Sequence, residues 1–276
     1  EYPNHVFVAE VAKPVALCIP QKNGNTFWSM LLYRCTLSAS QFRAIPIKNG
    51  TKQIKQEDIW KRLELRFRSV NDRLYFLRED VVRRYMIVRN PYTRLLSGYL
   101  DKIEGNAPER SKAEKVMKVK ISSFQDFVEG VYLYRKSVSD VQLMKTIRED
   151  LVRHLLAPQA DHCLLPCGVS YTYLKLEEAH VWYPSMIREL GLEAATTSGW
   201  GDPPCFLSLD GECDVRKWRR KENVHTKGRV HAHDAQSKLL HYYTPHAASL
   251  VTRLFIDDFV NFQYPLWNGS GSIKIT

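Results

Sequence analysis

A lysine and a glycine follow a short apolar run, in a pattern that suits the binding of an anion. Residues 15–19 are Val-Ala-Leu-Cys-Ile, which is typical of a buried strand, and Lys22 and Gly24 stand in the loop behind it. An apolar pattern with helical spacing begins at Trp28. Such a junction presents unpaired backbone N–H groups at a helix N-terminus, and with a lysine beside them they favour a phosphate. The loop differs from that of nucleoside triphosphatases, where the lysine follows the last glycine and precedes Ser or Thr.

A second junction of the same kind lies further along the chain. The apolar run 85–88 places Arg89 at its carboxyl end, and Pro91 suits the first turn of the helix that follows. Ser97 lies on that helix. A guanidinium and a hydroxyl make a good phosphate clamp, and open α/β folds bind ligands at the carboxyl ends of their strands. Each residue alone could be an ordinary surface residue, but two such junctions in one chain favour a shared anion site.

The elements that must position these residues are those of an α/β fold. A third strand candidate, residues 171–176, again ends at a charged residue, Glu177, and helical patterns separate the three strands. A chain of 276 residues is long enough for one α/β domain and too short to require two. We therefore predict a single domain over residues 1–276, with its motifs in about 15–265 and a mostly parallel sheet flanked by helices.

Several local signals predict where helices begin and end. Ser123 is expected to cap one helix and Thr244 another, while residues 139–156 have a long helical pattern. Residues 106–120 are strongly polar, and Pro108 cannot continue the preceding helix. This segment is therefore predicted to begin as a mobile loop and to lead into a basic helix that contains Lys112, Lys115, Lys118 and Lys120.

The composition excludes a disordered chain and favours anionic partners. Apolar residues make up 44% of the chain, which is typical of a globular protein. The formal net charge of +10 attracts anions, so nucleic acid, an acidic membrane surface and a sulfated or uronic-acid glycan all fit. A solvated basic face is the simpler alternative.

The six cysteines form an even set. Cys18 and Cys35 lie in apolar patterns and are predicted to be buried free thiols. Cys163 lacks partners at the spacing of a metal site, so we predict no metal. Two pairs are close enough in sequence to be disulfide candidates, Cys163 with Cys167 and Cys205 with Cys213.

Several segments of the chain resemble the motifs of the Golgi carbohydrate sulfotransferases and occur in the same order. Residues 22–28 are similar to the family's K-x-G-C-T-x-W loop for the 5′-phosphosulfate, with Asn25 in place of the cysteine. Residues 88–102 are similar to V-R-x-P-x-x-R-L-x-S-x-Y-x-D-K, the 3′-phosphate segment. The relatives in question are the chondroitin, dermatan and related 4-O-sulfotransferases. The likeness continues in residues 154–167, 171–177 and 242–264.

The resemblance implies a donor, PAPS (3′-phosphoadenosine 5′-phosphosulfate), which leaves PAP as product. Lys22 and the backbone N–H groups of residues 24–28 would hold the 5′-phosphate. Arg89 and Ser97 would hold the 3′-phosphate, while Arg94 either supports the loop or binds phosphate. The candidates for donor binding are Lys22, Asn23, Gly24, Asn25, Thr26, Phe27, Trp28, Arg89, Arg94 and Ser97.

Transfer to a hydroxyl also needs a general base. His154 is the first candidate, because histidine titrates in the useful pH range and this one lies in a family-like run. The alternative role for His154 is to cap the end of the predicted helix. The carboxylate alternatives for the base are Glu57, Asp58, Glu64 and Glu177.

The sequence thus predicts a PAPS-dependent sulfotransferase that acts on a hydroxyl, on an anionic glycan and not on nucleic acid. The alternatives are a small-molecule sulfotransferase, which would be cytoplasmic, and a non-catalytic basic module that binds polyanions. No apolar stretch approaches the ~20 residues of a membrane span, and no signal peptide is visible, so the anchor of a Golgi enzyme would lie outside this chain. Acceptor sequences for N-glycosylation at Asn49 and Asn268 are compatible with the Golgi lumen or secretory pathway.

Overall fold

The computed structural model describes ten stretches of the chain, and every structural statement below concerns these residues. They are 6–9, 15–24, 28–29, 31–33, 47–48, 51–52, 82–138, 157–163, 168–190 and 235–271.

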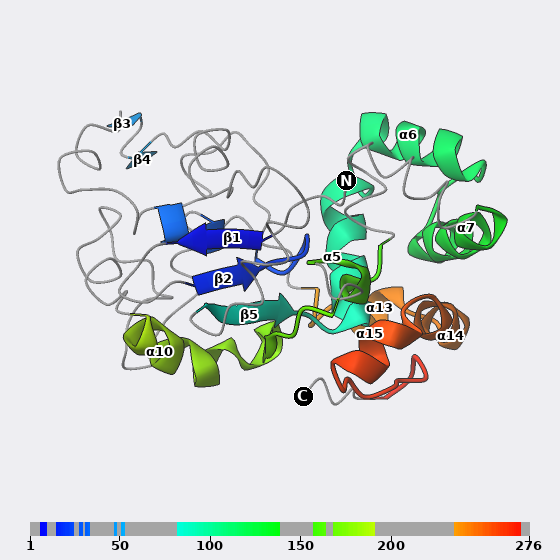
Figure 1. Cartoon of the computed structure of the whole chain (residues 1–276). Helices are drawn as coiled ribbons and strands as arrows, with labels where there is room; N and C mark the ends of the chain where they lie inside the picture. Colours follow the sequence, from blue (N-terminus) through cyan, green and yellow to red (C-terminus); the bar gives the residue numbers. More distant parts are fainter. Residues whose placement is uncertain are drawn as a thin grey trace.

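The main sheet has four strands in the order β1-β2-β5-β6, of which Figure 1 labels β1, β2 and β5. The strands β2 and β5 pair in parallel, as do β5 and β6, while β1 runs antiparallel to β2. The predicted α/β fold with a mostly parallel sheet is therefore confirmed. A separate antiparallel pair joins β3 and β4. The strands are β1 (Val6–Ala9), β2 (Val15–Cys18), β3 (Ile47–Lys48), β4 (Thr51–Lys52), β5 (Arg83–Val88) and β6 (Thr172–Lys175).

Helices and short 3₁₀ turns flank this sheet. The arrowheads of β2 and β5 point the same way in Figure 1, toward α5. The helices are α5 (Pro91–Lys102), α6 (Ala107–Met117), α7 (Phe124–Ser137), α10 (Ala179–Glu189), α13 (Leu239–Tyr242), α14 (Pro245–Leu254) and α15 (Ile256–Asn261). The 3₁₀ turns are η1 (Gln159–Asp161) and η3 (Leu176–Glu178). None of the helices within the described stretches has the length and apolar character needed to cross a lipid bilayer.

The helix starts follow the capping signals of the sequence. The Asn90 side chain accepts a hydrogen bond from the Tyr92 N–H at 3.0 Å at the start of α5. Ser123 and Asp126 form a reciprocal capping box on α7, and Thr244 caps α14 through the Ala247 N–H at 3.2 Å. The caps predicted at Ser123 and Thr244 are confirmed.

The basic helix predicted within residues 106–120 is present as α6, which carries Lys112 and Lys115, but the mobile loop predicted before it is wrong, because α6 already begins at Ala107. Pro108 lies in the first turn of this helix, where a backbone N–H has no partner within the helix in any case. The proline therefore marks the boundary between α5 and α6 and is compatible with the helical structure of α6. The long helix predicted for residues 139–156 lies outside the described residues.

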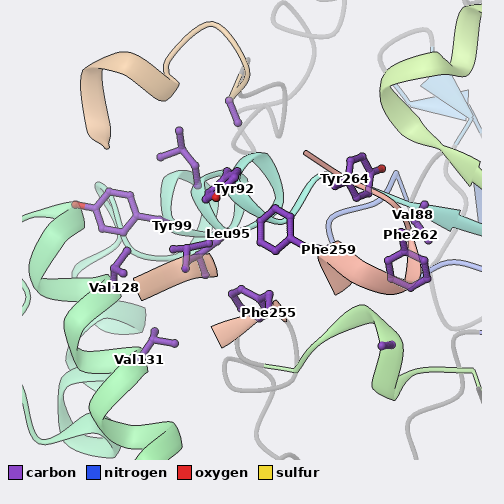
Figure 2. Close-up of a cluster of buried hydrophobic side chains, with 14 of the residues drawn as sticks. Val88, Tyr92, Leu95, Tyr99, Val128, Val131, Phe255, Phe259, Phe262 and Tyr264 are labelled. Atoms are coloured by element: carbon purple, nitrogen blue, oxygen red, sulfur yellow. The ribbon is translucent and has the colours of Figure 1, made fainter. Parts of the chain in front are cut away.

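Two apolar clusters cover the two faces of the sheet. Because side chains alternate along a strand, Ala16 and Met86 pack on one face, and Leu17 and Ile87 on the other. The first cluster includes residues of α5, α7, α14 and α15, and the second includes residues of α10. Figure 2 shows the first cluster, where Tyr92 of α5 lies beside Phe259, with ring centroids 4.9 Å apart. This packing holds α5 beside the edge of the sheet at which β5 ends.

A disulfide between Cys18 and Cys163 corrects two predictions. Cys18 is not a free thiol, and Cys163 does not pair with Cys167. The two Cα atoms lie 5.9 Å apart although 145 positions separate the residues in sequence, because the end of β2 meets the segment that carries η1. The predicted pairing of Cys205 with Cys213 lies outside the described residues, as does Cys35.

Replacing both Cys18 and Cys163 by alanine is expected to lower the free energy of unfolding by about 2–5 kcal/mol, because the bond closes a long loop and restricts the unfolded chain. Denaturant unfolding followed by tryptophan fluorescence measures the change. Peptide mapping of the unreduced wild-type protein should recover one cross-linked fragment that contains both cysteines. Unchanged stability, or Cys163 recovered in a cross-link to another cysteine, would contradict this assignment.

Candidate functional site

The two strand-to-helix junctions meet at one edge of the sheet. Since β2 and β5 are parallel neighbours, the loop after β2 and the residues after β5 leave the sheet at the same end. Arg89 Nη1 donates a hydrogen bond to the backbone oxygen of Lys22 at 2.8 Å. Arg89 Nε donates to Thr93 Oγ1 at 3.2 Å, which fixes the guanidinium between the loop and α5. The structure therefore brings Lys22 and Arg89 together, as the sequence predicts.

The loop after β2 has an unusual backbone. Lys22 and Gly24 both have positive φ angles, 70° and 80°. At Gly24 a side chain would also approach the indole of Trp28, with a Cβ 3.3 Å from its Cδ1, so glycine suits this position on two grounds. The Trp28 N–H donates to Gly24 O at 3.1 Å, as in a helical first turn, and that N–H is thus not available to an anion. Asn25, Thr26 and Phe27, predicted to hold a phosphate, lie outside the described residues.

The Lys22 side chain is paired with a carboxylate on α5. Its Nζ lies 2.8 Å from Asp101 Oδ2, and the side chains are only 13% and 3% exposed. Lys102 Nζ lies 3.4 Å from the same oxygen. Burial lowers the pKa of Lys22, while the charge and hydrogen bond of Asp101 oppose that shift. The ammonium is thus held in a partly desolvated place, where an anion would interact with it strongly.

One face of α5 lines the loop. Arg94, Ser97 and Asp101 are three and four positions apart and so lie on the same face of this helix. Arg94 Nε donates to Gln21 O at 3.1 Å, and its Nη1 donates to Ala157 O at 3.0 Å. Burial lowers the pKa of Arg94 to about 10. These contacts are those of a loop support, which is one of the two roles predicted for Arg94, and Ser97 lies buried beside them.

Glu177 lies at the same edge of the sheet, just after β6. Its Oε1 accepts hydrogen bonds from the Asn90 N–H at 2.9 Å and from Thr93 Oγ1 at 3.2 Å. Its Oε2 accepts from the Tyr264 hydroxyl at 3.0 Å, and burial together with this carboxylate raises the pKa of Tyr264. The carboxylate thus holds the N-terminal end of α5. The other candidate bases, His154, Glu57, Asp58 and Glu64, lie outside the described residues.

Three polar residues at this site had no role in the sequence-based prediction. They are Asp101, Gln159 and Asp258, and all three are buried. Each lies within a segment that resembles a family motif, which was the only sequence signal for them. Gln159 and Asp258 come from η1 and α15, so their contact with the two junctions depends on the tertiary fold.

Comparison with known proteins gives one match. A family model described as the sulfotransferase family matches residues 4–265. No curated protein and no solved structure matches the chain.

Replacing Asp101 by asparagine is expected to lower the pKa of Lys22 further, because the change removes the charge and the ionic hydrogen bond that oppose burial. The folded variant would hold this proton less tightly than the unfolded chain. Its free energy of unfolding should therefore rise with pH between the folded pKa and the ordinary lysine value. NMR titration of the Lys22 side chain measures the pKa, with Asp257→Asn on the exposed surface of α15 as the matched control. An unchanged or higher pKa would contradict the pairing.

Proposed function

This chain belongs to the sulfotransferase family, and we propose that it moves a sulfuryl group from PAPS to a hydroxyl group of a glycan. Sulfuryl transfer makes demands like those of phosphoryl transfer: the reacting groups must lie in line, and the charge on the leaving phosphate must be stabilised. The donor and the glycan are our inferences, and the family membership alone supports only sulfuryl transfer in general.

One observation carries the proposal: Arg89 Nη1 lies 2.8 Å from the backbone oxygen of Lys22. The donor has phosphates at its 5′ and 3′ positions, so it needs two cationic sites a short distance apart. The two junctions supply one cation each at the same sheet edge. The positive φ angles of Lys22 and Gly24 and the close approach of Gly24 to Trp28 also fit a loop that follows a ligand closely.

The residues of this chain have distinct parts in the proposed reaction. When bound, the donor supplies a sulfuryl group activated by its phosphate leaving group. The Lys22 ammonium neutralises charge on the 5′ side, and Arg89, steadied by Thr93, binds the 3′ side. Lys102 Nζ also lies 3.4 Å from Asp101 Oδ2, so this buried carboxylate has a second counterion besides Lys22.

The acceptor side of the proposal rests on charge and compartment. A net charge of +10 favours an anionic glycan over a neutral small alcohol. The disulfide between Cys18 and Cys163 is typical of the oxidising secretory pathway, and Asn268, a possible glycosylation site, is exposed. These points support the Golgi lumen over the cytoplasm, where a small-molecule enzyme would act. His154 is our proposed general base.

Wild-type protein is expected to bind PAP tightly in calorimetry, and Arg89→Ala should weaken that binding by about 100-fold, since charge-assisted hydrogen bonds to the 3′-phosphate are lost. Arg253→Ala, which removes an exposed arginine of α14, is the matched control and should bind normally. A basic module would instead prefer long polyanions with steep salt dependence. Such behaviour without PAP binding would overturn the proposed activity.

His154→Ala is expected to reduce turnover by about 10²–10⁴-fold while leaving PAP affinity nearly unchanged, because a general base acts on the acceptor hydroxyl. Transfer of labelled sulfate to a panel of glycans and small alcohols measures the activity and identifies the acceptor class. Reduced PAP affinity in this variant would argue for a structural role, and turnover restricted to small alcohols would favour the small-molecule alternative.

A further inference from the structure

Gln159 connects the two junctions through one buried carboxamide. Its side chain is completely buried, with 0% exposure. Its Oε1 accepts hydrogen bonds from Asn23 Nδ2 at 2.6 Å and from the Arg89 N–H at 2.9 Å. Its Nε2 donates to the backbone oxygen of Arg89 at 2.8 Å. A single amide therefore bonds the loop after β2 and both backbone polar groups of the residue after β5.

Asn23 is the loop residue that bonds to Gln159. It is fully buried next to Lys22, and its Nδ2 donates to Ile87 O at 2.7 Å as well as to Gln159. The loop is thus attached both to the end of β5 and to the carboxamide that holds Arg89. The placement of Lys22 and the placement of Arg89 therefore share the same support.

Asp258 on α15 holds Gln159 in place. The two Asp258 oxygens accept hydrogen bonds from the backbone N–H groups of Gln159 and Ala160, at 2.9 and 2.8 Å. Oδ2 also lies 3.3 Å from Gln159 Nε2. Burial raises the pKa of Asp258, while the charge of Arg94 and these hydrogen bonds favour the ionised form. This carboxylate fixes both the backbone of η1 and the orientation of the amide.

We propose that Gln159 is a positioning residue that sets the spacing between the Lys22 and Arg89 cations, and so tunes the site to a nucleotide with both a 5′- and a 3′-phosphate. The inference rests on the proposed function, because it concerns the same donor. The chemistry requires glutamine: an apolar side chain makes none of these bonds, and a carboxylate accepts but does not donate to Arg89 O. Since Gln159 is buried, it acts through Asn23 and Arg89 and not by contact with the ligand.

Calorimetry with PAP and with AMP, which lacks the 3′-phosphate, distinguishes a loss of Arg89 positioning from a general loss of stability. The ratio of the two affinities reports what the 3′-phosphate contributes. In Gln159→Met this ratio should fall about tenfold or more, because Arg89 is no longer held relative to the loop. The matched control is Gln236→Met, at an exposed position before α13, and it should keep the wild-type ratio.

A second variant tests the proposal even if Gln159→Met misfolds. Asn23→Ala removes the hydrogen bond between the loop and Gln159 but leaves the bonds between Gln159 and Arg89. It should lower the ratio of PAP affinity to AMP affinity as well. If Gln159→Met shows no cooperative unfolding transition, it is not properly folded, and the affinity ratio of the folded Asn23→Ala variant then tests the proposal. Equal loss of affinity for PAP and AMP in the folded variants would overturn the positioning role alone. Wild-type protein that binds PAP no better than AMP would overturn the proposed donor and this inference together.

Discussion

The parallel pairing of β2 with β5 is the constraint on which the candidate site depends. Cys18 lies opposite Met86 in this pair, so the two strands end within a few residues of each other at the same edge. The loop that carries Lys22 and the turn that carries Arg89 consequently begin side by side. An antiparallel pairing would have sent them to opposite ends of the sheet. The apolar clusters on both faces keep the strands in this arrangement, because a shift by one residue would exchange the two faces.

Buried carboxylates hold the cations of the site before any anion is bound. Asp101 lies against Lys22 and Lys102, and Asp258 attracts Arg94. A charge fixed in this way does not have to be ordered during the reaction, which is the main advantage of an electrostatically preorganised site. The same carboxylates limit the net positive charge in the interior, where unpaired ions are costly. The arrangement thus reconciles a stable core with several cations at the proposed donor site.

The sequence was sufficient to predict the fold class and the meeting of Lys22 with Arg89, because strand and helix signals flank both residues and parallel strands follow a simple rule. Pro108 was misjudged because a proline that interrupts one helix equally well begins the next. The apolar run of residues 15–19 indicated that Cys18 is buried but contained no information on its distant partner. Gln159 in the turn η1 and Asp258 in the short helix α15 could not be assigned either, since their roles depend on contacts between segments far apart in the sequence. The single-domain organisation and the roles of the site residues remain predictions.

The position of the disulfide has a consequence for how the protein matures. Cys18 lies next to the loop of Lys22, while its partner follows Gln159 by four positions and comes 145 residues later in the chain. During synthesis the first junction emerges long before the segment that will lock it. Covalent closure of the site must therefore wait until Cys163 has been synthesised and both thiols meet an oxidant. A chain arrested or cleaved before that point would retain its lysine loop without the cross-link that ties this loop to the remainder of the site.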